Sequence, residues 1–423
     1  MLGFPRLISS TLFLDVAKLV SGTAGGRLIL LLALPVATRL YDTEDFQLLA
    51  VFVALVGTFS VIAGLRFEIA IPLAETDGDA ANLLILALLS AGGISSVLLV
   101  LAGTIPSSLA QLLGVAAFAP YLWLVALGVI LVASYSALQF WTTRMHRFGA
   151  IARTRIGQAG TGAAAMLCLG WAGIAPLGLM IGHLLSMGAG GLSLAAQMLR
   201  SDDRLLREIE WRNLGAAFRA YQRYPLFSTP EALANVAGIQ MPILIIAASS
   251  GEEAGQLFLA MQVMGAPMTL LGASVGQVYA SRAAEELRNG SLYSFTMFMM
   301  RRLFLIGLGP IVLAAFLAPF VFPLVFGNEW QRAGIIVAWI APWMLAQLVV
   351  SPVSMGLHVT GALQTAMLLQ FLGLFLRVGA VMLAVYVGID EQVELYAVSG
   401  AAFYSLYALV LIRVLINSAH RVV

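Results

Sequence analysis

The chain has 423 residues, of which 61% are hydrophobic and 10% are charged, and its net charge at pH 7 is +2. Soluble globular domains carry roughly 25% charged residues, so this composition excludes a soluble protein and indicates a polytopic membrane protein. Lys18 is the only lysine and Cys168 the only cysteine. These counts exclude a Gly-Lys-Ser/Thr phosphate-binding loop, an internal disulfide and a thiolate metal site. We therefore expect no cofactor and no metal, and the small net charge gives no reason to expect nucleic-acid binding.

Twelve apolar segments are long enough to cross a membrane, which takes about 20 helical residues. The first contains Asp15 and Lys18 and has no clear cleavage site, so we do not expect it to be a removed signal peptide. The sequence thus predicts an all-α membrane protein of about twelve transmembrane helices. The segments run approximately over 12–38, 46–72, 80–104, 119–141, 150–171, 176–198, 231–249, 256–280, 300–326, 333–357, 361–388 and 393–416.

Arginines are distributed unequally between the connecting loops, and such residues concentrate on the cytoplasmic side. The opposite loops hold only Arg39 and Arg332 beside many acidic residues. We therefore expect both termini to be cytoplasmic. The arginines assigned to the cytoplasmic loops and tail are Arg144, Arg147, Arg153, Arg155, Arg200, Arg204, Arg207, Arg212, Arg219, Arg223, Arg282, Arg288, Arg301, Arg302 and Arg421.

The longest polar stretch, about 199–229, divides the segments into six and six. Apolar residues recur in it at helical spacing among arginines, which is typical of a helix lying on the inner membrane surface; a solvated linker helix is the alternative. We predict an N-terminal six-helix lobe over 1–199, an amphipathic linker over 200–230 and a C-terminal six-helix lobe over 231–423. The apolar residues of the stretch are Leu205, Ile209, Leu214, Phe218 and Tyr221.

Two arginines lie deep in predicted membrane helices, where an ionisable side chain is costly and marks a functional site by default. Arg27 is about 18 Å from the outer end of the first helix at 1.5 Å per residue, and Arg377 is comparably deep in the eleventh. We expect both to face an internal aqueous cavity. The alternatives are an ion pair between helices or a bond to a backbone carbonyl. A cationic cavity favours an anionic cargo, because the guanidinium binds phosphate with two parallel hydrogen bonds.

Four further charged residues fall near the cytoplasmic ends of the first two helices. Asp15 and Lys18 are three residues apart and can neutralise each other, and Arg66 can extend to the lipid headgroups. Glu68 is the best placed carboxylate for coupling to an ion gradient. The alternative for all four is an ordinary role at the membrane interface.

Small residues recur every fourth position in two predicted helices, a spacing that lets another backbone approach closely. Such contacts fit either static packing or helices that move against each other. The residues are Gly22 and Gly26 in the first helix, and Gly178, Gly182, Ser186 and Gly190 in the sixth.

Five stretches together resemble the polysaccharide-transporter branch of the MOP flippase superfamily, the Wzx-like flippases. One departure is Gln47, where that family usually has glycine. The stretches are Thr38–Phe46 (TRLYDTEDF), Leu65–Pro72 (LRFEIAIP), Tyr224–Pro230 (YPLFSTP), Glu252–Gln256 (EEAGQ) and Phe326–Gly334 (FGNEWQRAG).

The resemblance implies two six-helix lobes around a central cavity, and a flippase that moves an undecaprenyl-diphosphate-linked oligosaccharide across the bacterial inner membrane by alternating access. The cargo would be an O-antigen, capsule or exopolysaccharide repeat unit. It further implies that Arg27 and Arg377 hold the anionic cargo, with Arg66 at the cytoplasmic mouth, and that Asp15 or Glu68 couples transport to an ion gradient. Membrane lipid, a polysaccharide polymerase and a chain-length regulator are the implied partners.

Three alternatives remain open. A multidrug extruder of the same superfamily would typically need deep carboxylates for cationic substrates, and a lipid II flippase usually has fourteen spans. A membrane glycan polymerase or ligase would need a sizeable charged outer loop, and the longest predicted one, around 104–118, has no charged residue. We therefore expect a transporter and not an enzyme.

Overall fold

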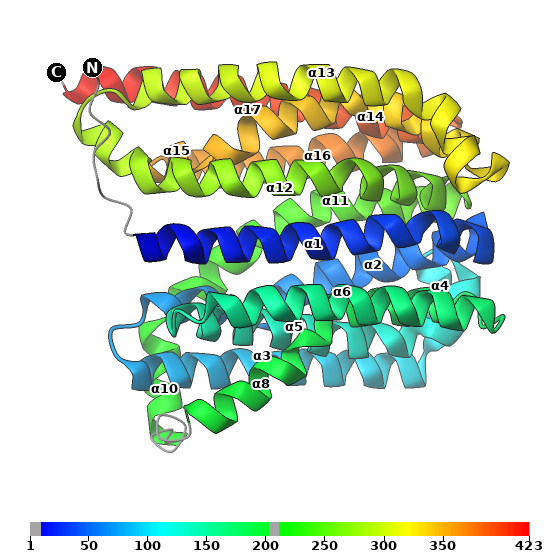
Figure 1. Cartoon of the computed structure of the whole chain (residues 1–423), viewed down its shortest axis with the longest axis horizontal. Coiled ribbons are helices and arrows are strands. Elements are labelled where there is room, and N and C mark those ends of the chain that lie inside the picture. Colours follow the sequence, from blue (N-terminus) through cyan, green and yellow to red (C-terminus); the bar gives the residue numbers. More distant parts are fainter. Residues whose placement is uncertain (1–9, 203–210, 423) are drawn as a thin grey trace. The chain divides into compact units, whose positions relative to one another are not determined.

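The computed structural model describes residues 10–202 and 211–422, and every regular element within those ranges is a helix (Figure 1). This confirms the predicted all-α class. The long helices are α1 (Ser10–Leu40), α2 (Thr43–Ala63), α3 (Asp77–Thr104), α5 (Leu122–Arg144), α6 (Phe148–Trp171), α11 (Thr229–Ser249), α12 (Glu253–Arg288), α13 (Leu292–Phe326), α14 (Gln331–Val350), α16 (Leu363–Val387) and α17 (Gln392–Val422). The shorter ones are η1 (Phe67–Leu73), α4 (Pro106–Leu112), η2 (Ala116–Tyr121), α7 (Leu177–Gly188), α8 (Gly190–Ser201), α10 (Trp211–Ala220), η3 (Tyr224–Ser228), η4 (Asn328–Trp330), η5 (Ser351–Val353) and α15 (Met355–Val359).

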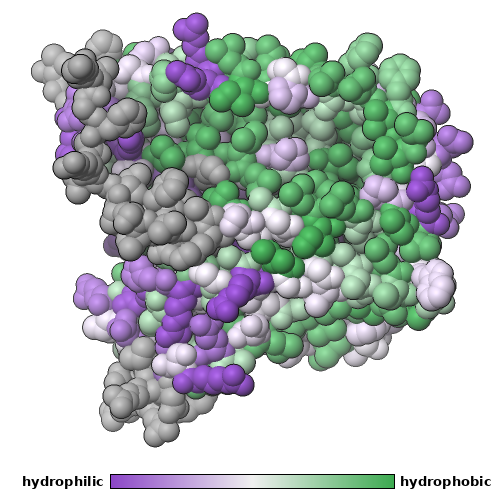
Figure 2. Space-filling model, viewed as in Figure 1, coloured by the Kyte–Doolittle hydropathy of each residue, from purple (hydrophilic) through white to green (hydrophobic). Residues whose placement is uncertain are grey.

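Eleven helical segments of the described chain are long and apolar enough to cross a membrane. Helix α6 has 24 residues and is long enough to be a twelfth, but its first half is less apolar because it contains Arg153, Arg155 and Gln158. The helices present apolar side chains outward, as the green surface of Figure 2 shows, and Leu32, Leu324 and Phe375 are at least 70% exposed. The chain is a multi-pass membrane protein.

One predicted helix end and one predicted loop assignment are wrong. The second helix does not run from 46 to 72: α2 ends at Ala63, and the chain turns through Leu65 (φ 49°) and Arg66 (φ 60°) into η1. Apolar composition alone did not reveal this turn. Arg153 and Arg155 were counted with the cytoplasmic loops, but they lie inside α6 and within the predicted segment 150–171.

The chain divides into two compact units. Unit 1 contains residues 1–33, 59–106 and 120–230, and unit 2 contains residues 34–58, 107–119 and 231–423. The 34–58 segment belongs to unit 2 because its side chains bond there: Gln47 Nε2 donates to the Ala247 carbonyl at 2.9 Å, and Thr43 donates to Glu252. A Cβ on Gly255 would lie 2.6 Å from the Thr43 carbonyl, so only glycine permits this approach.

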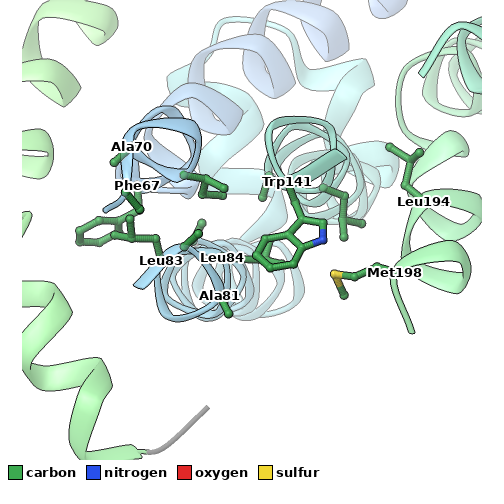
Figure 3. Close-up of a cluster of buried hydrophobic side chains, with 14 of the residues drawn as sticks. Phe67, Ala70, Ala81, Leu83, Leu84, Trp141, Leu194 and Met198 are labelled. Atoms are coloured by element: carbon green, nitrogen blue, oxygen red, sulfur yellow. The ribbon is translucent and has the colours of Figure 1, made fainter. Parts of the chain in front are cut away.

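The core of unit 1 is an apolar cluster from η1, α3, α5 and α8 (Figure 3). Phe67, Leu84 and Trp141 are its large members and are at most 1% exposed. Asp202 fixes the end of α8 to this core. Its carboxylate accepts the Trp141 indole N–H at 3.0 Å and two hydrogen bonds from the Arg147 guanidinium, at 2.5 and 3.0 Å.

The described part of the predicted linker packs onto unit 1. Helix α10 contacts α3, burying Leu214 and Ala217, and the Phe218 ring lies 5.7 Å from that of Phe67. Part of the apolar side of α10 therefore meets protein. Leu205 and Ile209 lie outside the described residues.

In unit 2, Arg332 joins three segments. Its Nε lies 2.8 Å from Glu253 of α12, and its Nη1 lies 2.7 Å from Glu394 of α17. Beside it, Trp330 is fully buried and its ring packs 4.7 Å from Phe46. These contacts fix the ends of α12, α14 and α17, and α17 in turn packs against α16.

Candidate functional site

Arg377 lies on α16 in unit 2, and its side chain is fully buried. Its Nε donates to the Gly373 carbonyl one turn earlier at 2.9 Å. Its guanidinium carbon lies 4.6 Å from the centre of the Phe403 ring on α17, a cation–π distance. In the described part of the chain, Nη1 and Nη2 have no hydrogen-bond partner. Most of the donors of this buried cation are therefore unused.

Two glycines make room for this guanidinium. A Cβ on Gly238 of α11 would lie 2.9 Å from Nη2 and 3.1 Å from the Leu374 Cα. A Cβ on Gly373 would lie 2.5 Å from the Phe403 ring. An added Cβ at either glycine would be too close to its neighbours for van der Waals contact. A larger residue at Gly238 or Gly373 would therefore displace Arg377 or Phe403. The Tyr396 hydroxyl, on α17, donates to the Ile239 carbonyl at 3.0 Å and ties α17 to α11.

Arg27 lies on α1 in unit 1 and is half-buried. It is an electrostatic neighbour of the Arg155 guanidinium on α6 and of the buried imidazole of His183 on α7. The hydrogen bonds of the Arg155 guanidinium go to neutral groups, the Thr23 hydroxyl and the Gln139 amide oxygen at 3.4 Å. The two cations of this cluster, Arg27 and Arg155, come from two helices and favour an anion.

Glycines bring these three helices together. Added Cβ atoms on Gly22 and Gly26 of α1 would lie 2.6 Å from the Ala152 Cα and 2.9 Å from the Arg155 carbonyl. One on Gly182 of α7 would lie 2.8 Å from the Gly162 carbonyl of α6. The prediction that small residues at this spacing permit close backbone approach is confirmed.

Arg66 and Glu68 lie together at the turn after α2. Arg66 Nη1 is 3.7 Å from Glu68 Oε1, and Glu68 is only 6% exposed. Glu68 Oε2 is buried and has no hydrogen-bond partner among the described residues. Burial raises the pKa of the Glu68 carboxyl, and the neighbouring Arg66 charge opposes this increase.

The backbone around Glu68 is fitted to this carboxylate. A Cβ on Gly64 would lie 2.5 Å from Glu68 Oε2. Leu65 and Arg66 both have left-handed φ angles, which cost non-glycine residues about 1–2 kcal/mol each. Strained backbone of this kind clusters at functional sites.

The predicted site residues that the structure describes are distributed over both units. Arg66 and Glu68 form a pair in unit 1, Arg27 belongs to a second cluster of that unit, and Arg377 lies in unit 2. The side chain of Asp15 lies outside the described residues. Among the side chains that are described, no group of three histidine, cysteine, aspartate or glutamate residues could hold a metal.

Sequence reasoning did not identify the neighbours of the two deep arginines. Phe403 and Gly238 enclose Arg377, and Arg155 and His183 accompany Arg27. Gly238 and Gly373 were visible as glycines inside apolar segments, but their shared role depends on helices far apart in the sequence. Arg155 was set aside as a loop residue.

Solved structures share this fold. An inward-facing multidrug resistance MATE family transporter of the MOP superfamily matches with a TM-score of 0.59 and 15% identity, covering 95% of this chain and 96% of that chain. A MOP superfamily transporter from Pyrococcus furiosus, whose description reports a binding pocket of reversed polarity, matches with a TM-score of 0.58 and 15% identity, with 95% of each chain covered. No curated protein sequence matches this chain.

The family described as polysaccharide biosynthesis protein matches residues 36–334, most of the chain. That match and the shared fold confirm the resemblance found from the sequence motifs. The chain belongs to the polysaccharide biosynthesis protein family and has the fold of the MOP-superfamily transporters.

Proposed function

We propose that this protein is a flippase that moves an undecaprenyl-diphosphate-linked oligosaccharide from the inner to the outer leaflet of the bacterial inner membrane. The cargo is the repeat unit of an O-antigen, a capsule or an exopolysaccharide. Transport proceeds by alternating access, in which the binding site opens to one side of the membrane at a time. The family membership supports the polysaccharide pathway, and the shared fold supports transport.

The buried guanidinium of Arg377 carries the anionic part of this proposal. An isolated charge in a low-dielectric interior is costly unless it is paired. Of the donors of Arg377, only Nε bonds to the protein among the described residues. The two terminal amino groups form a planar fork that fits two phosphate oxygens. A diphosphate reaching this fork would offset the cost of keeping the cation buried.

The cluster of Arg27, Arg155 and His183 in unit 1 supplies a second place for negative charge. Arg27 is only half-buried, so it can meet a ligand without rearrangement of the core. We assign Arg27 and Arg377 to the diphosphate or to acidic sugars, and Arg66 to the cytoplasmic mouth. A multidrug extruder handling cations would need carboxylates at these positions.

Glu68 is the residue we assign to coupling with a proton or sodium gradient. Its carboxylate is buried, its Oε2 has no hydrogen-bond partner among the described residues, and its Oε1 lies beside Arg66. The charge state of this carboxyl is therefore sensitive to small changes around it. Asp15 is the second coupling candidate, from its sequence position. The proposal further includes cytoplasmic termini and, as partners, a polysaccharide polymerase and a chain-length regulator.

Mass spectrometry of polyprenyl-linked glycans tests the function. A strain lacking the gene should accumulate one lipid-linked oligosaccharide and lose the matching surface glycan, and the wild-type gene should restore both. Arg27→Ala and Arg377→Ala should each restore export poorly while inserting normally. Arg282→Ala removes an exposed arginine outside the three sites and serves as the control.

Two results would contradict the proposal. Full export by Arg27→Ala, Arg377→Ala and the double variant would contradict the role of the cationic residues. An unchanged pool of lipid-linked glycans in the deletion strain, with normal surface glycan, would favour a small-molecule extruder, which drug sensitivity of the same strain would then reveal.

A further inference from the structure

A groove lined by both polar and small apolar residues lies between α6 and α8 of unit 1, and none of its lining residues is among those assigned to transport above. Its volume is about 570 Å³, within the range of about 300–1,000 Å³ that is typical of ligand sites. In Figure 2, hydrophilic side chains gather over the region where α6 begins and α8 ends. The lining includes Arg153, Thr154, Gln158, Ser193, Gln197 and Arg200.

The groove is cationic. Arg153 and Arg200 are exposed and lie near the start of α6 and the end of α8. No carboxylate is among its lining residues in the described part of the chain. Nearby, Asp202 is occupied by Arg147 and Trp141 and does not neutralise the groove. The two arginines are therefore available to an anion.

The floor of the groove is fixed by a break between α7 and α8. The Gly190 N–H, at the start of α8, is donated to Gln158 Oε1 at 3.2 Å. This bond orients the Gln158 amide and leaves its NH₂ donors available to a ligand. A Cβ on Gly190 would lie 2.6 Å from Gln158 Oε1, so glycine at this position is what allows the bond. Thr154 adds a hydroxyl, held 3.5 Å from the Tyr135 hydroxyl.

The groove belongs to the membrane-exposed part of the protein. Helix α8 forms the end of the candidate span Leu177–Ser201. Leu192 and Leu199 of the same helix are 74% and 62% exposed, as expected for side chains that contact acyl chains. A ligand in the groove meets arginines at the end of the span, while the exposed leucines lie on the same helix outside the groove lining. Basic pockets between transmembrane helices with this arrangement bind anionic lipid headgroups.

We propose that this groove binds the headgroup of an anionic glycerophospholipid. Arg153 and Arg200 pair with its phosphate, Gln158 and Ser193 bond to the polar part of the headgroup, and the acyl chains lie along Leu192 and Leu199. The lining contains none of the residues assigned to transport, and we propose that the bound lipid acts as a structural or regulatory ligand and is not the cargo.

Native mass spectrometry of the full-length protein tests this proposal. The purified protein is mixed in detergent with phosphatidylglycerol, phosphatidylethanolamine or phosphatidylcholine, and the bound lipid is measured by titration. We expect phosphatidylglycerol to bind preferentially. The double variant Arg153→Gln/Arg200→Gln should bind it about thirtyfold more weakly, from the typical contribution of a basic residue near an anionic surface.

Two further variants separate the groove from general charge. Arg282→Gln/Arg288→Gln removes the same charge from exposed positions of α12 and should leave binding unchanged. Ala196→Trp adds bulk to the groove lining without altering charge and should weaken phosphatidylglycerol binding. Thermal unfolding of each variant in detergent checks that it is folded.

Three results would overturn the proposal. Equal binding of phosphatidylcholine and phosphatidylglycerol would show that the headgroup charge is not recognised. An equal loss in the two double-arginine variants would indicate unspecific electrostatics. Displacement of phosphatidylglycerol by millimolar inorganic phosphate would assign the groove to a small soluble anion. The binding assay does not depend on transport, so its result tests the lipid site independently of the flippase proposal.

Discussion

The Arg377 guanidinium lies 4.6 Å from the centre of the Phe403 ring and donates only its Nε within the described protein. An aromatic face partly compensates a cation that has lost its water, but it does not satisfy the remaining N–H donors. The buried Arg377 guanidinium between α16 and α17 therefore lowers the stability of the fold, which is typical of a functional residue.

Replacing Arg377 by methionine tests whether the buried charge lowers the free energy of unfolding. Methionine fills a similar space and carries no charge, and removing buried ionic groups in favour of apolar ones often stabilises proteins by about 1–4 kcal/mol. We expect Arg377→Met to unfold at a higher temperature in detergent and to lose glycan export. Lower stability together with normal export would show that Arg377 serves packing only.

Replacing Phe403 by leucine tests the cation–π contact itself. We expect Phe403→Leu to destabilise the wild-type protein more than it destabilises Arg377→Met, because the contact exists only when the guanidinium is present. A double-mutant cycle from thermal unfolding should give a coupling of about 0.5–2 kcal/mol. Additive effects of the two substitutions would mean that the ring acts only as an apolar side chain.

The glycine contacts between α6 and α7 predict a contrast between two alanine substitutions. In Gly182→Ala, the new Cβ would lie 2.5 Å from Met166 Cβ and 2.8 Å from the Gly162 carbonyl, and such overpacking costs about 1–3 kcal/mol. Gly160→Ala, on α6, meets no atom within 4 Å and should stabilise the helix by about 0.5–1 kcal/mol. Thermal unfolding compares them, and equal stabilities would refute the close contact.

Glu68 predicts a pH dependence of stability. Burial raises the pKa of its carboxyl in the folded protein above the unfolded value, which is about 4.3. Below that unfolded value the carboxyl is protonated in both states. As the pH rises from the unfolded pKa to the folded pKa, the unfolded state loses the proton that the folded state still binds, so stability falls across this interval and levels off above the folded pKa.

Glu68→Gln should remove this dependence, because the amide does not titrate. We expect wild type and variant to have similar unfolding temperatures near pH 4, and the variant to be more stable near pH 8. Glu75→Gln alters a nearby carboxylate outside η1 and should retain the wild-type slope. Parallel pH profiles for wild type and Glu68→Gln would rule out Glu68 as the titrating group.

Composition and segment length were sufficient to predict the fold class. Over such long apolar stretches, only a helix makes all of its backbone hydrogen bonds within one segment inside the lipid. The twelve predicted segments correspond to eleven candidate spans and α6. The end of α2 was missed because Leu65 and Arg66 adopt left-handed backbone angles that nothing in an apolar pattern signals. The small-residue spacing did predict close helix contacts, since a missing Cβ is itself the physical requirement.

The candidate site was predicted only in part. Depth along a helix identified Arg27 and Arg377, because the position of a charge relative to a span end can be counted from the sequence. Depth did not reveal that Phe403, Gly238 and Gly373 enclose Arg377, or that Arg155 and His183 accompany Arg27. These neighbours come from helices that are distant in sequence, and helical periodicity does not determine which helices pack together.

The sequence by itself determined that this is a multi-pass helical membrane protein of a recognisable family, since hydropathy and short motifs are local properties of the chain. Only the tertiary structure decided that the 34–58 segment packs with unit 2, that α10 covers α3, and that α6 and α8 form a cationic groove. Each of these depends on contacts between distant segments, where the free energy of packing and hydrogen bonding selects one partner among many of similar composition.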